Sequence, residues 1–515
     1  MKNLFKKISA LVLAAIMVLT MCSAVFADTN TPAGTAADKG SITVKGVEEG
    51  ATVKAYPIVK AVYGADGTFT GYENTYNLGD ITDPKLAELS NIASDKDLEA
   101  ADVVTLDKQQ DGSYKKDNLS VGMYLIHVIG TESTVYNVAV ASINYVNANG
   151  DFAINPGEVV MVKDGAAWVK KSNAPTVTKK ILESKTVATN KLGSTQNIGS
   201  DVKYEVTINP IPNYSGNHPT LYVEDTLSAG LTYNNGLEVK VKDGDTSTAL
   251  TEDTDYVVTV PTENSNVLKV DFVVDGKYKL NGYLGKSVVI TYKARLNTSA
   301  TLDLNANTNT VKLHYTKDSK QEGNPATSED KITNTYTFDL NDVLLGENGV
   351  ITKVDSTQKT PLKDAEFTLY TNENCTEKYT NSVFKGVVKS DDNGKLGTIS
   401  NESMKGFAAG TYYLKETKAP AGYSLNAKVY KVVISADNDK YNNNGELTEW
   451  TVTIDDTLVA TNGNTTDAGI QIPNTHLSNL PSTGGMGTYL FTIVGVVLMT
   501  CAAGAFFVSR RKTNK

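Results

Sequence analysis

The chain has very little cysteine, with three residues among 515. Cys22 lies close to the N-terminus and Cys501 lies in an apolar run near the C-terminus, so Cys375 alone remains in the body of the chain. Small exported proteins often rely on disulfides, but a single thiol cannot close one internally. Some other interaction must hold this body together.

The sequence also has no excess of basic residues and no pattern typical of a catalytic site. The formal net charge is −9, and no basic stripe indicates nucleic acid. We find no nucleophile elbow, no HExxH pattern and no DxSxS metal-adhesion motif, so we expect neither an enzyme nor a cofactor or metal site. The four histidines are scattered along the chain: His127, His218, His314 and His476.

Long apolar runs occur only at the two ends. At the N-terminus, Lys2, Lys6 and Lys7 precede an apolar stretch from Ile8 to Val18, and Val25-Phe26-Ala27 supplies small residues for cleavage. This pattern predicts a secretory signal peptide over residues 1–27.

At the C-terminus, the stretch Tyr489 to Val508 has no charge and is followed by basic residues from Arg510 onward. Its length is about the 20 residues that a membrane-spanning helix needs, and the basic tail favours an inside location. A plain anchor does not explain the pentapeptide before it, which consists of Leu480, Pro481, Ser482, Thr483 and Gly484.

This pentapeptide matches the LPxTG cell-wall sorting signal of Gram-positive surface proteins, and residues 480–515 have its order of motif, apolar span and basic tail. The match implies that a sortase cysteine attacks the carbonyl of Thr483 and releases Gly484 onward. The apolar span then holds the substrate only until transfer.

Between the ends, short runs of alternating apolar and polar residues recur between turn signals, as in Val202–Ile208 and Val288–Ala294. This pattern predicts an all-β protein of tandem β-sandwiches, arranged as an elongated rod. Breaks near 172–175 and 345–349 divide the body. We therefore expect three domains, over residues 28–172, 173–341 and 342–476.

Several strands place a polar residue on the face where an apolar one belongs. In the second domain, alternation puts Lys179, Asp225 and Asn309 on inward faces. In the third domain it does the same for Lys353, Glu416 and Asn474. A single case is more simply a strand end or a buried ion pair, but two matching sets favour a shared chemistry.

Burial gives these sets a chemical purpose. It lowers the pKa of a lysine amine and raises that of a carboxyl group. A neutral amine is a nucleophile, and a protonated acid can polarise a carboxamide. We therefore expect Lys353 to attack Asn474 with Glu416 as catalyst, and Lys179 to attack Asn309 with Asp225 as catalyst. Each reaction would expel ammonia and leave an isopeptide bond.

The same residues lie in segments that resemble a known family. The stretch "YYLKETKAPAGY" matches the E-box of Gram-positive pilins and, with "VITKVD" and "IPNT", resembles a collagen-adhesin B-type domain. The stretches "VEDTLSAGLTYN" and "NTVKLHY" resemble the A-type domain. The whole chain resembles the major backbone pilin of sortase-assembled pili, which implies immunoglobulin-like sandwiches with internal isopeptide bonds.

The sequence departs from the family in two places. After the late strand of the middle domain it reads "YTKDSK" in place of "YSNNP", so the choice of asparagine depends on the inward position of Asn309. Lys180 stays the alternative to Lys179. The strict pilin motif is absent, and its nearest equivalent ends at Lys171, with Lys170 and then Lys163 as alternatives. In the first domain His127 takes the place of the catalytic acid, so we expect no bond there.

The resemblance implies a cell-wall-anchored surface pilus, or fimbrium. Its expected partners are a class C sortase for polymerisation, a housekeeping sortase for anchoring, further copies of the chain, peptidoglycan, accessory pilins and host surface ligands. The alternative is a wall-anchored adhesin or accessory pilin displayed as a single copy. A shaft subunit needs a linking lysine, whereas a tip subunit does not.

Overall fold

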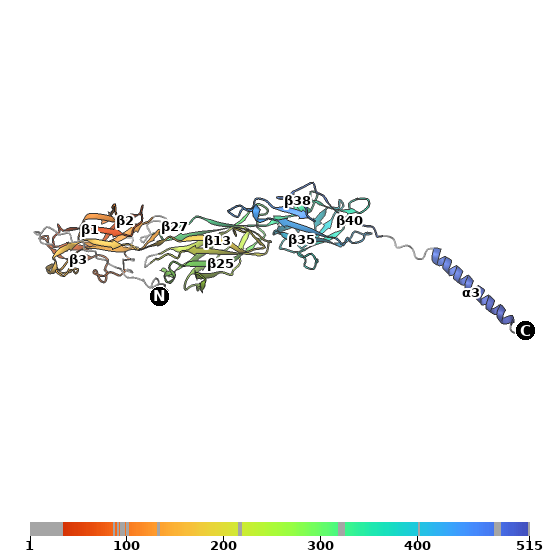
Figure 1. The fold of residues 1–515 in the computed structure, drawn as a ribbon, viewed down its shortest axis with the longest axis horizontal. Coiled ribbons are helices and arrows are strands. Elements are labelled where there is room, and N and C mark those ends of the chain that lie inside the picture. Colours follow the sequence, from red (N-terminus) through yellow and green to blue (C-terminus); the bar gives the residue numbers. More distant parts are fainter. Residues whose placement is uncertain are drawn as a thin grey trace, which may run out of the picture. The chain divides into compact units, whose positions relative to one another are not determined.

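The computed structural model describes residues 34–85, 88–89, 92, 98, 102–130, 134–214, 219–317, 325–399, 402–477 and 486–512. The predicted signal peptide and the sorting pentapeptide at 480–484 lie outside these residues. The described part is built almost entirely of β-strands, followed by a C-terminal apolar helix (Figure 1), which confirms the all-β prediction.

By their contacts the residues form two compact units. One comprises residues 1–338, 406–409 and 436–450, and the other comprises residues 339–405, 410–435 and 451–515. The predicted first domain and residues 173–338 of the predicted second domain fall within the first unit. The predicted boundaries at 172 and 341 remain predictions.

The predicted first domain has two main sheets. One has the order β11-β1-β6-β5, and the other has the order β10-β9-β7-β2-β3 with β4 beside β2. Alternate residues such as Ile42, Val44 and Ile126 are fully buried and form the core. The elements are β1 (Lys39–Lys45), β2 (Thr52–Tyr63), β3 (Phe69–Asn74), β4 (Val104–Thr105), β5 (Asp107–Lys108), β6 (Tyr114–Ser120), β7 (Gly122–Ile129), β8 (Thr134–Tyr136), β9 (Ala139–Val146), η2 (Pro156–Glu158), β10 (Met161–Lys163), β11 (Gly165–Trp168) and β12 (Lys171–Asn173).

The predicted second domain is a sandwich of two larger sheets. Their orders are β13-β16-β25-β19-β20, with β18 beside β25, and β14-β15-β28-β26-β17-β22-β21, with β27 beside β26. The elements are β13 (Thr176–Glu183), β14 (Thr186–Val187), β15 (Gly193–Thr195), β16 (Asp201–Asn209), β17 (Leu221–Leu227), β18 (Leu231–Tyr233), β19 (Glu238–Asp243), β20 (Thr246–Ala249), β21 (Val257–Thr259), β22 (Val267–Asp271), β23 (Val273–Val274), β24 (Lys277–Tyr278), η3 (Asn281–Tyr283), β25 (Ser287–Leu296), β26 (Asn307–Tyr315), β27 (Ala326–Thr327), β28 (Lys331–Tyr336) and β29 (Phe338–Asp339).

The predicted third domain contains a sheet with the order β33-β32-β31-β35-β36-β37-β38-β39 and a separate parallel pair of β30 and β40. That pair joins the first strand of the domain to the last. The elements are α2 (Asn341–Leu344), β30 (Ile351–Asp355), β31 (Glu366–Tyr370), β32 (Val387–Ser390), β33 (Leu396–Thr398), β34 (Lys405–Phe407), β35 (Gly410–Lys418), β36 (Val429–Ser435), η4 (Asn438–Lys440), β37 (Thr451–Ile454), β38 (Thr457–Thr461), β39 (Asn464–Thr465) and β40 (Ile470–Asn474).

The C-terminal helix α3 (Met486–Lys512) contains the predicted span. Its stretch Tyr489–Arg511 has 23 residues and a mean hydropathy of 2.3, which is long and apolar enough to cross a membrane. The basic residues Arg510 and Arg511 lie at its end, in agreement with the sorting-signal pattern.

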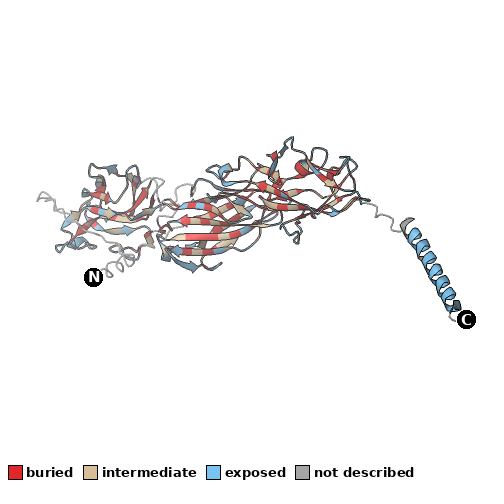
Figure 2. Ribbon diagram, turned by 45° about the vertical axis from the view of Figure 1, so that its right-hand side comes forward, coloured by how far each residue is buried: buried red, intermediate tan, exposed pale blue. Residues whose placement is uncertain are grey.

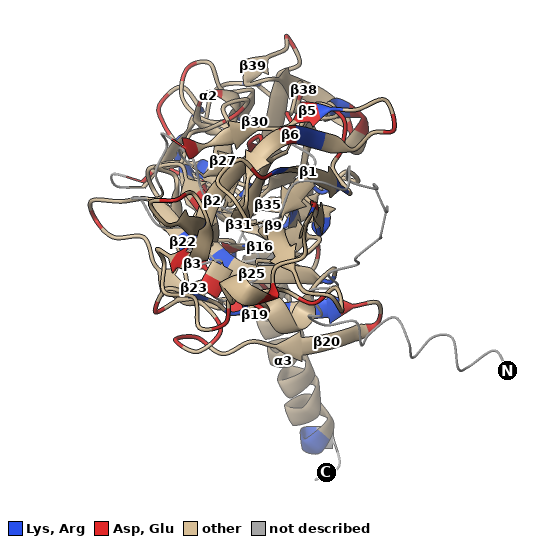
Figure 3. Cartoon of the chain, turned by 90° about the vertical axis from the view of Figure 1, so that its left-hand side faces the viewer, with Lys and Arg blue, Asp and Glu red and all other residues tan. Residues whose placement is uncertain are grey.

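Burial alternates along the strands as the sequence pattern predicts, and Figure 2 shows it as red segments interrupted by tan or blue ones. In β17, for example, Leu221, Val223, Asp225 and Leu227 are buried and the residues between them are more exposed. Figure 3 shows the coloured charged residues mostly in connecting loops and at strand ends, the usual place for charge. The few buried charged residues therefore need an explanation.

Candidate functional site

The third domain brings its three predicted residues together in the core. Lys353 lies on β30 and Asn474 on β40, and these strands pair in parallel with Lys353 opposite Ile472. Glu416 lies on β35, in the facing sheet. The three residues are 0%, 2% and 1% exposed, respectively. The alternation that makes each strand amphipathic thus directs the amine of Lys353, the carboxyl of Glu416 and the amide of Asn474 into the same part of the core.

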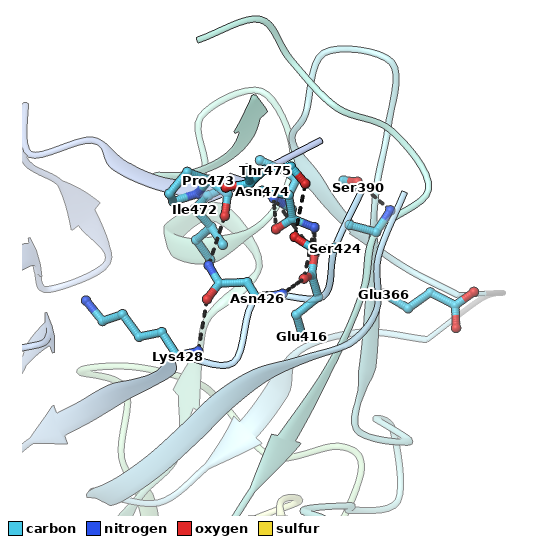
Figure 4. Close-up of polar contacts among 12 residues, drawn as sticks. Glu366, Ser390, Glu416, Ser424, Asn426, Lys428, Ile472, Pro473, Asn474 and Thr475 are labelled. Atoms are coloured by element: carbon cyan, nitrogen blue, oxygen red, sulfur yellow. Dashed lines mark hydrogen bonds and ion pairs between the residues drawn. The ribbon is translucent and has the colours of Figure 1, made fainter. Parts of the chain in front are cut away.

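The contacts among the three residues fit a reacting set. The Lys353 Nζ lies 2.7 Å from Asn474 Oδ1 and 2.8 Å from the carbonyl oxygen of Ile472. The Asn474 Nδ2 donates to both carboxyl oxygens of Glu416, at 3.0 Å each, and Figure 4 shows these two side chains pointing toward each other. The Lys353 Nζ is 3.8 Å from Glu416 Oε1. The amine therefore lies at the oxygen side of the amide and the acid lies at the nitrogen side.

Burial changes the protonation of the amine. It lowers the pKa of Lys353 from its ordinary 10.5 to about 8, although the neighbouring Glu416 carboxyl acts in the opposite direction. Near neutral pH an appreciable fraction of the amine is then unprotonated and carries the lone pair that a nucleophile needs.

Two further residues position this site, and the sequence pattern did not indicate either. The backbone N–H of Asn426 donates to Glu416 Oε2 at 2.6 Å, and its Nδ2 donates to the carbonyl of Pro473 at 3.0 Å (Figure 4). Gly394 accepts from the Lys353 N–H at 2.7 Å and has a φ of +73°, and a Cβ there would lie 2.3 Å from the Lys353 carbonyl oxygen. Glycine is thus required where the chain crosses beside the lysine.

The second domain also gathers its predicted residues. Lys179 on β13, Asp225 on β17 and Asn309 on β26 are 5%, 2% and 0% exposed. The Lys179 ammonium pairs directly with the Asp225 carboxylate. Burial lowers the pKa of Lys179 to about 8, and the Asp225 charge offsets part of that effect.

A tyrosine that the sequence pattern did not single out links these three residues. The hydroxyl of Tyr292, on β25, donates to Asp225 Oδ2 at 2.6 Å and accepts from Asn309 Nδ2 at 2.7 Å. It also lies 3.2 Å from Lys179 Nζ. A tyrosine at an inward position of an alternating strand is normally a core residue, so no sequence signal distinguishes Tyr292 from other buried aromatic residues. Burial raises its pKa well above the ordinary value.

The structure separates Lys179 from the alternative, Lys180. The Lys180 side chain points to the other face of β13, where it is 41% exposed and its Nζ pairs with Glu205 at 2.6 Å. In the first domain, His127 is buried on β7 opposite Lys54 on β2. The expectation that no bond forms in that domain stays a prediction.

Lys170 and Lys171, the first two candidate acceptor lysines, follow β11, and the third candidate, Lys163, ends β10. Lys171 begins β12, is exposed, and pairs through its backbone with Tyr136 on β8. Lys170 is also exposed, and Lys163 on β10 is half-buried. Among the described residues, no group of His, Cys, Asp and Glu is arranged to hold a metal ion.

Comparison with known families gives three matches. Residues 198–319 match the Cna-B-like domain of Gram-positive pilin backbone subunit 2. Residues 347–449 match a prealbumin-like fold domain, and residues 472–515 match the LPXTG cell wall anchor motif. The first match includes Asp225 and Asn309 but not Lys179, and the second includes Lys353 and Glu416 but not Asn474.

Whole-chain comparisons agree. The chain is 26% identical over 556 aligned residues to the trypsin-resistant surface T6 protein of Streptococcus pyogenes serotype M6, covering 92% of this chain and 95% of that one. The solved structure of the T6 backbone pilin, described as a modular three-domain structure, superposes with a TM-score of 0.51 at 21% identity. That superposition covers 86% of this chain and 99% of the pilin.

The anchor match bears on where the protein is located, and the pilin and T6 matches bear on what it builds. The anchor motif indicates sortase processing and attachment to the cell wall, and backbone pilins polymerise with themselves as structural, non-enzymatic subunits. The chain is thus a cell-wall-anchored surface protein with the domains of a Gram-positive backbone pilin, Cna-B-like and prealbumin-like, and it is similar along almost its whole length to the T6 protein.

Proposed function

We propose that this backbone pilin is a self-crosslinking shaft subunit. Two autocatalytic isopeptide bonds stabilise it, and a sortase joins Thr483 of one copy to Lys171 of the next. The observation that carries the proposal is the third-domain set, in which a fully buried Lys353 amine lies 2.7 Å from the Asn474 carboxamide oxygen. The domains are those expected from the sequence, over residues 28–172, 173–341 and 342–476.

The third-domain reaction balances without a cofactor. Glu416 takes a proton from the Lys353 ammonium, and the neutral amine attacks Cγ of Asn474. A new C–N bond forms, the bond from Cγ to Nδ2 breaks, and Glu416 returns protons to the departing nitrogen. An ammonium and a carboxamide thus become an amide and an ammonium ion. Close placement in a rigid core replaces a separate enzyme.

Such a bond would supply the covalent restraint on the unfolded chain that disulfides give to other exported proteins. Lys353 and Asn474 are 121 residues apart and lie on the first and last strands of the domain. In the chain-entropy account, closing a loop of that length restrains the unfolded chain by about 5 kcal/mol. Strand pairing and covalent tie then act at the same place.

The acceptor lysine must differ from these buried lysines. Lys171 is exposed and comes directly after a second lysine, Lys170. It lies in a different part of the chain from Thr483, which belongs to the sorting signal. Linkage of the two is therefore head-to-tail, a heterologous contact that extends into a filament. The backbone-pilin match favours this shaft role over the single-copy adhesin. A class C sortase suits polymerisation and a housekeeping sortase suits the final anchoring.

Replacing the third-domain acid should block its crosslink. The wild-type domain should have a mass lower than its sequence mass by one ammonia, and Glu416→Ala should restore the full mass because proton transfer is lost. Intact and fragment mass spectrometry checks this. Glu366→Ala, which removes a half-buried carboxyl on the neighbouring strand β31, is the matched control and should keep the loss. A wild-type domain of full mass contradicts the proposal.

The second-domain crosslink should be visible as a branched peptide. Tryptic mapping should join the first strand, through Lys179, to the peptide Leu296–Lys312, which contains Asn309. Asn309→Ala should abolish the branch. Asn307→Ala, two residues earlier on the same strand and also buried, should leave it intact. A linear, unmodified Asn309 peptide from folded wild-type protein rules out this choice of asparagine.

Blocking the bond without removing the amine should expose a pH dependence. In Asn474→Ala, Lys353 keeps a pKa near 8 in the folded domain and the ordinary 10.5 when unfolded. The unfolded chain then binds more protons between these values, so the free energy of unfolding rises with pH there, by about 2 kcal/mol from pH 8 to 9.5. Pulse proteolysis in urea measures it. The control, Asn474→Ala with Lys353→Met, should lack this rise, and equal profiles would contradict the assignment.

Removing the linking amine should stop polymerisation. Lys171→Arg keeps the charge but not the nucleophile, so cell-wall extracts should lose the SDS-resistant high-molecular-weight ladder and retain wall-anchored monomer. Lys163→Arg is the matched control and should keep the ladder. Persistence of the ladder in both Lys171→Arg and the Lys170→Arg, Lys171→Arg double variant shows that the acceptor lies elsewhere.

A further inference from the structure

The two buried sets differ in how the acid reaches the amide. In the third domain, Asn474 Nδ2 lies 3.0 Å from both oxygens of Glu416, so the acid contacts the leaving nitrogen directly. In the second domain, Asn309 Nδ2 lies 2.7 Å from the Tyr292 hydroxyl, which in turn donates to Asp225 at 2.6 Å. The phenol occupies the position between the acid and the leaving nitrogen.

Side-chain length accounts for the difference. Aspartate is one methylene shorter than glutamate, so its carboxyl reaches less far from the strand. Asp225 and Asn309 lie on neighbouring antiparallel strands, with Asp225 opposite Val311 and Asn309 opposite Leu227. Tyr292 comes from β25 in the facing sheet, and its hydroxyl bridges the remaining space.

We propose that Tyr292 is a catalytic residue of the second-domain crosslink, where its hydroxyl carries the proton from Asp225 to the leaving nitrogen of Asn309. This inference rests on the proposed Lys179–Asn309 bond. It gives the shorter acid the reach that Glu416 has unaided.

The proposed reaction moves two protons from the Lys179 ammonium to the leaving nitrogen. Asp225 takes one proton from the Lys179 ammonium, and the neutral amine attacks Cγ of Asn309. Tyr292 gives its hydroxyl proton to Nδ2 and regains one from Asp225. Asp225 then removes the second proton from the new Lys nitrogen, the bond from Cγ to Nδ2 breaks, and ammonia leaves as ammonium with that proton. Tyr292 and Asp225 end in their starting states.

If the role of Tyr292 were purely structural, its hydroxyl would matter no more for bond formation than that of the neighbouring Tyr204. Its ring stacks on Tyr204 with centroids 5.5 Å apart, and both rings are buried. Both hydroxyls interact with Asn309, but that of Tyr292 also donates to the Asp225 carboxyl, whereas that of Tyr204 lies 3.4 Å from the Thr335 hydroxyl. If Tyr292 only packs, then Tyr292→Phe and Tyr204→Phe should affect bond formation alike.

The test follows bond formation in the full chain after cell-free synthesis. Tryptic peptides sampled over time report the fraction of uncrosslinked Asn309, and the Asn474 peptide in the same sample is the internal clock. In Tyr292→Phe, formation of the second-domain bond should be about 100-fold slower, the effect typical of a lost acid–base group, with the third-domain bond unchanged. Tyr204→Phe should keep the wild-type rate.

A rescue variant separates catalysis from packing. Tyr292→Phe combined with Asp225→Glu lengthens the acid by one methylene and should recover most of the rate, because the carboxyl then reaches Asn309 as Glu416 reaches Asn474. Limited proteolysis reports whether the domain is folded. A wild-type rate in Tyr292→Phe, or a folded double variant without recovery, overturns the role of Tyr292. Absence of the branch in the wild-type chain instead refutes the crosslink itself.

Discussion

The structure depends on two buried lysine amines, that of Lys353 against the Asn474 carboxamide and that of Lys179 against the Asp225 carboxyl. An isolated ammonium in a protein core is costly, and burial lowers the pKa of both Lys179 and Lys353 to about 8. A simple buried ion pair often contributes little to stability. These lysines make sense if the charge is removed by reaction, since an amide is neutral and its N–H and C=O are easily satisfied. A body with a single cysteine would then gain covalent ties from ordinary side chains.

The two sets show that one chemistry tolerates two arrangements. In the third domain the parallel strands β30 and β40 carry both partners, and Glu416 from the facing sheet contacts the amide directly. In the second domain Lys179 lies on a different sheet from Asp225 and Asn309, and Tyr292 from the lysine's own sheet completes the set. The proposed third-domain bond would therefore join two paired strands, whereas the proposed second-domain bond would join two sheets across the sandwich.

Period-2 alternation was enough to predict the all-β fold and the inward faces of Lys179, Asp225, Asn309, Lys353, Glu416 and Asn474, because each depends only on residues two apart on one strand. The same rule ranked Lys179 above Lys180. Tyr292 and Asn426 could not be predicted this way. Their roles come from which strand or loop faces the site across the sandwich, and tyrosine and asparagine occur in such positions for many other reasons.

The central claim is that Lys353 and Asn474 are one covalent unit in the mature protein, and a crystal structure at atomic resolution tests it most directly. The account predicts continuous electron density from Lys353 Nζ to Asn474 Cγ, with a bond of about 1.33 Å as in any amide, and no density for Asn474 Nδ2. An intact carboxamide with the amine still at hydrogen-bonding distance from its oxygen would contradict the account.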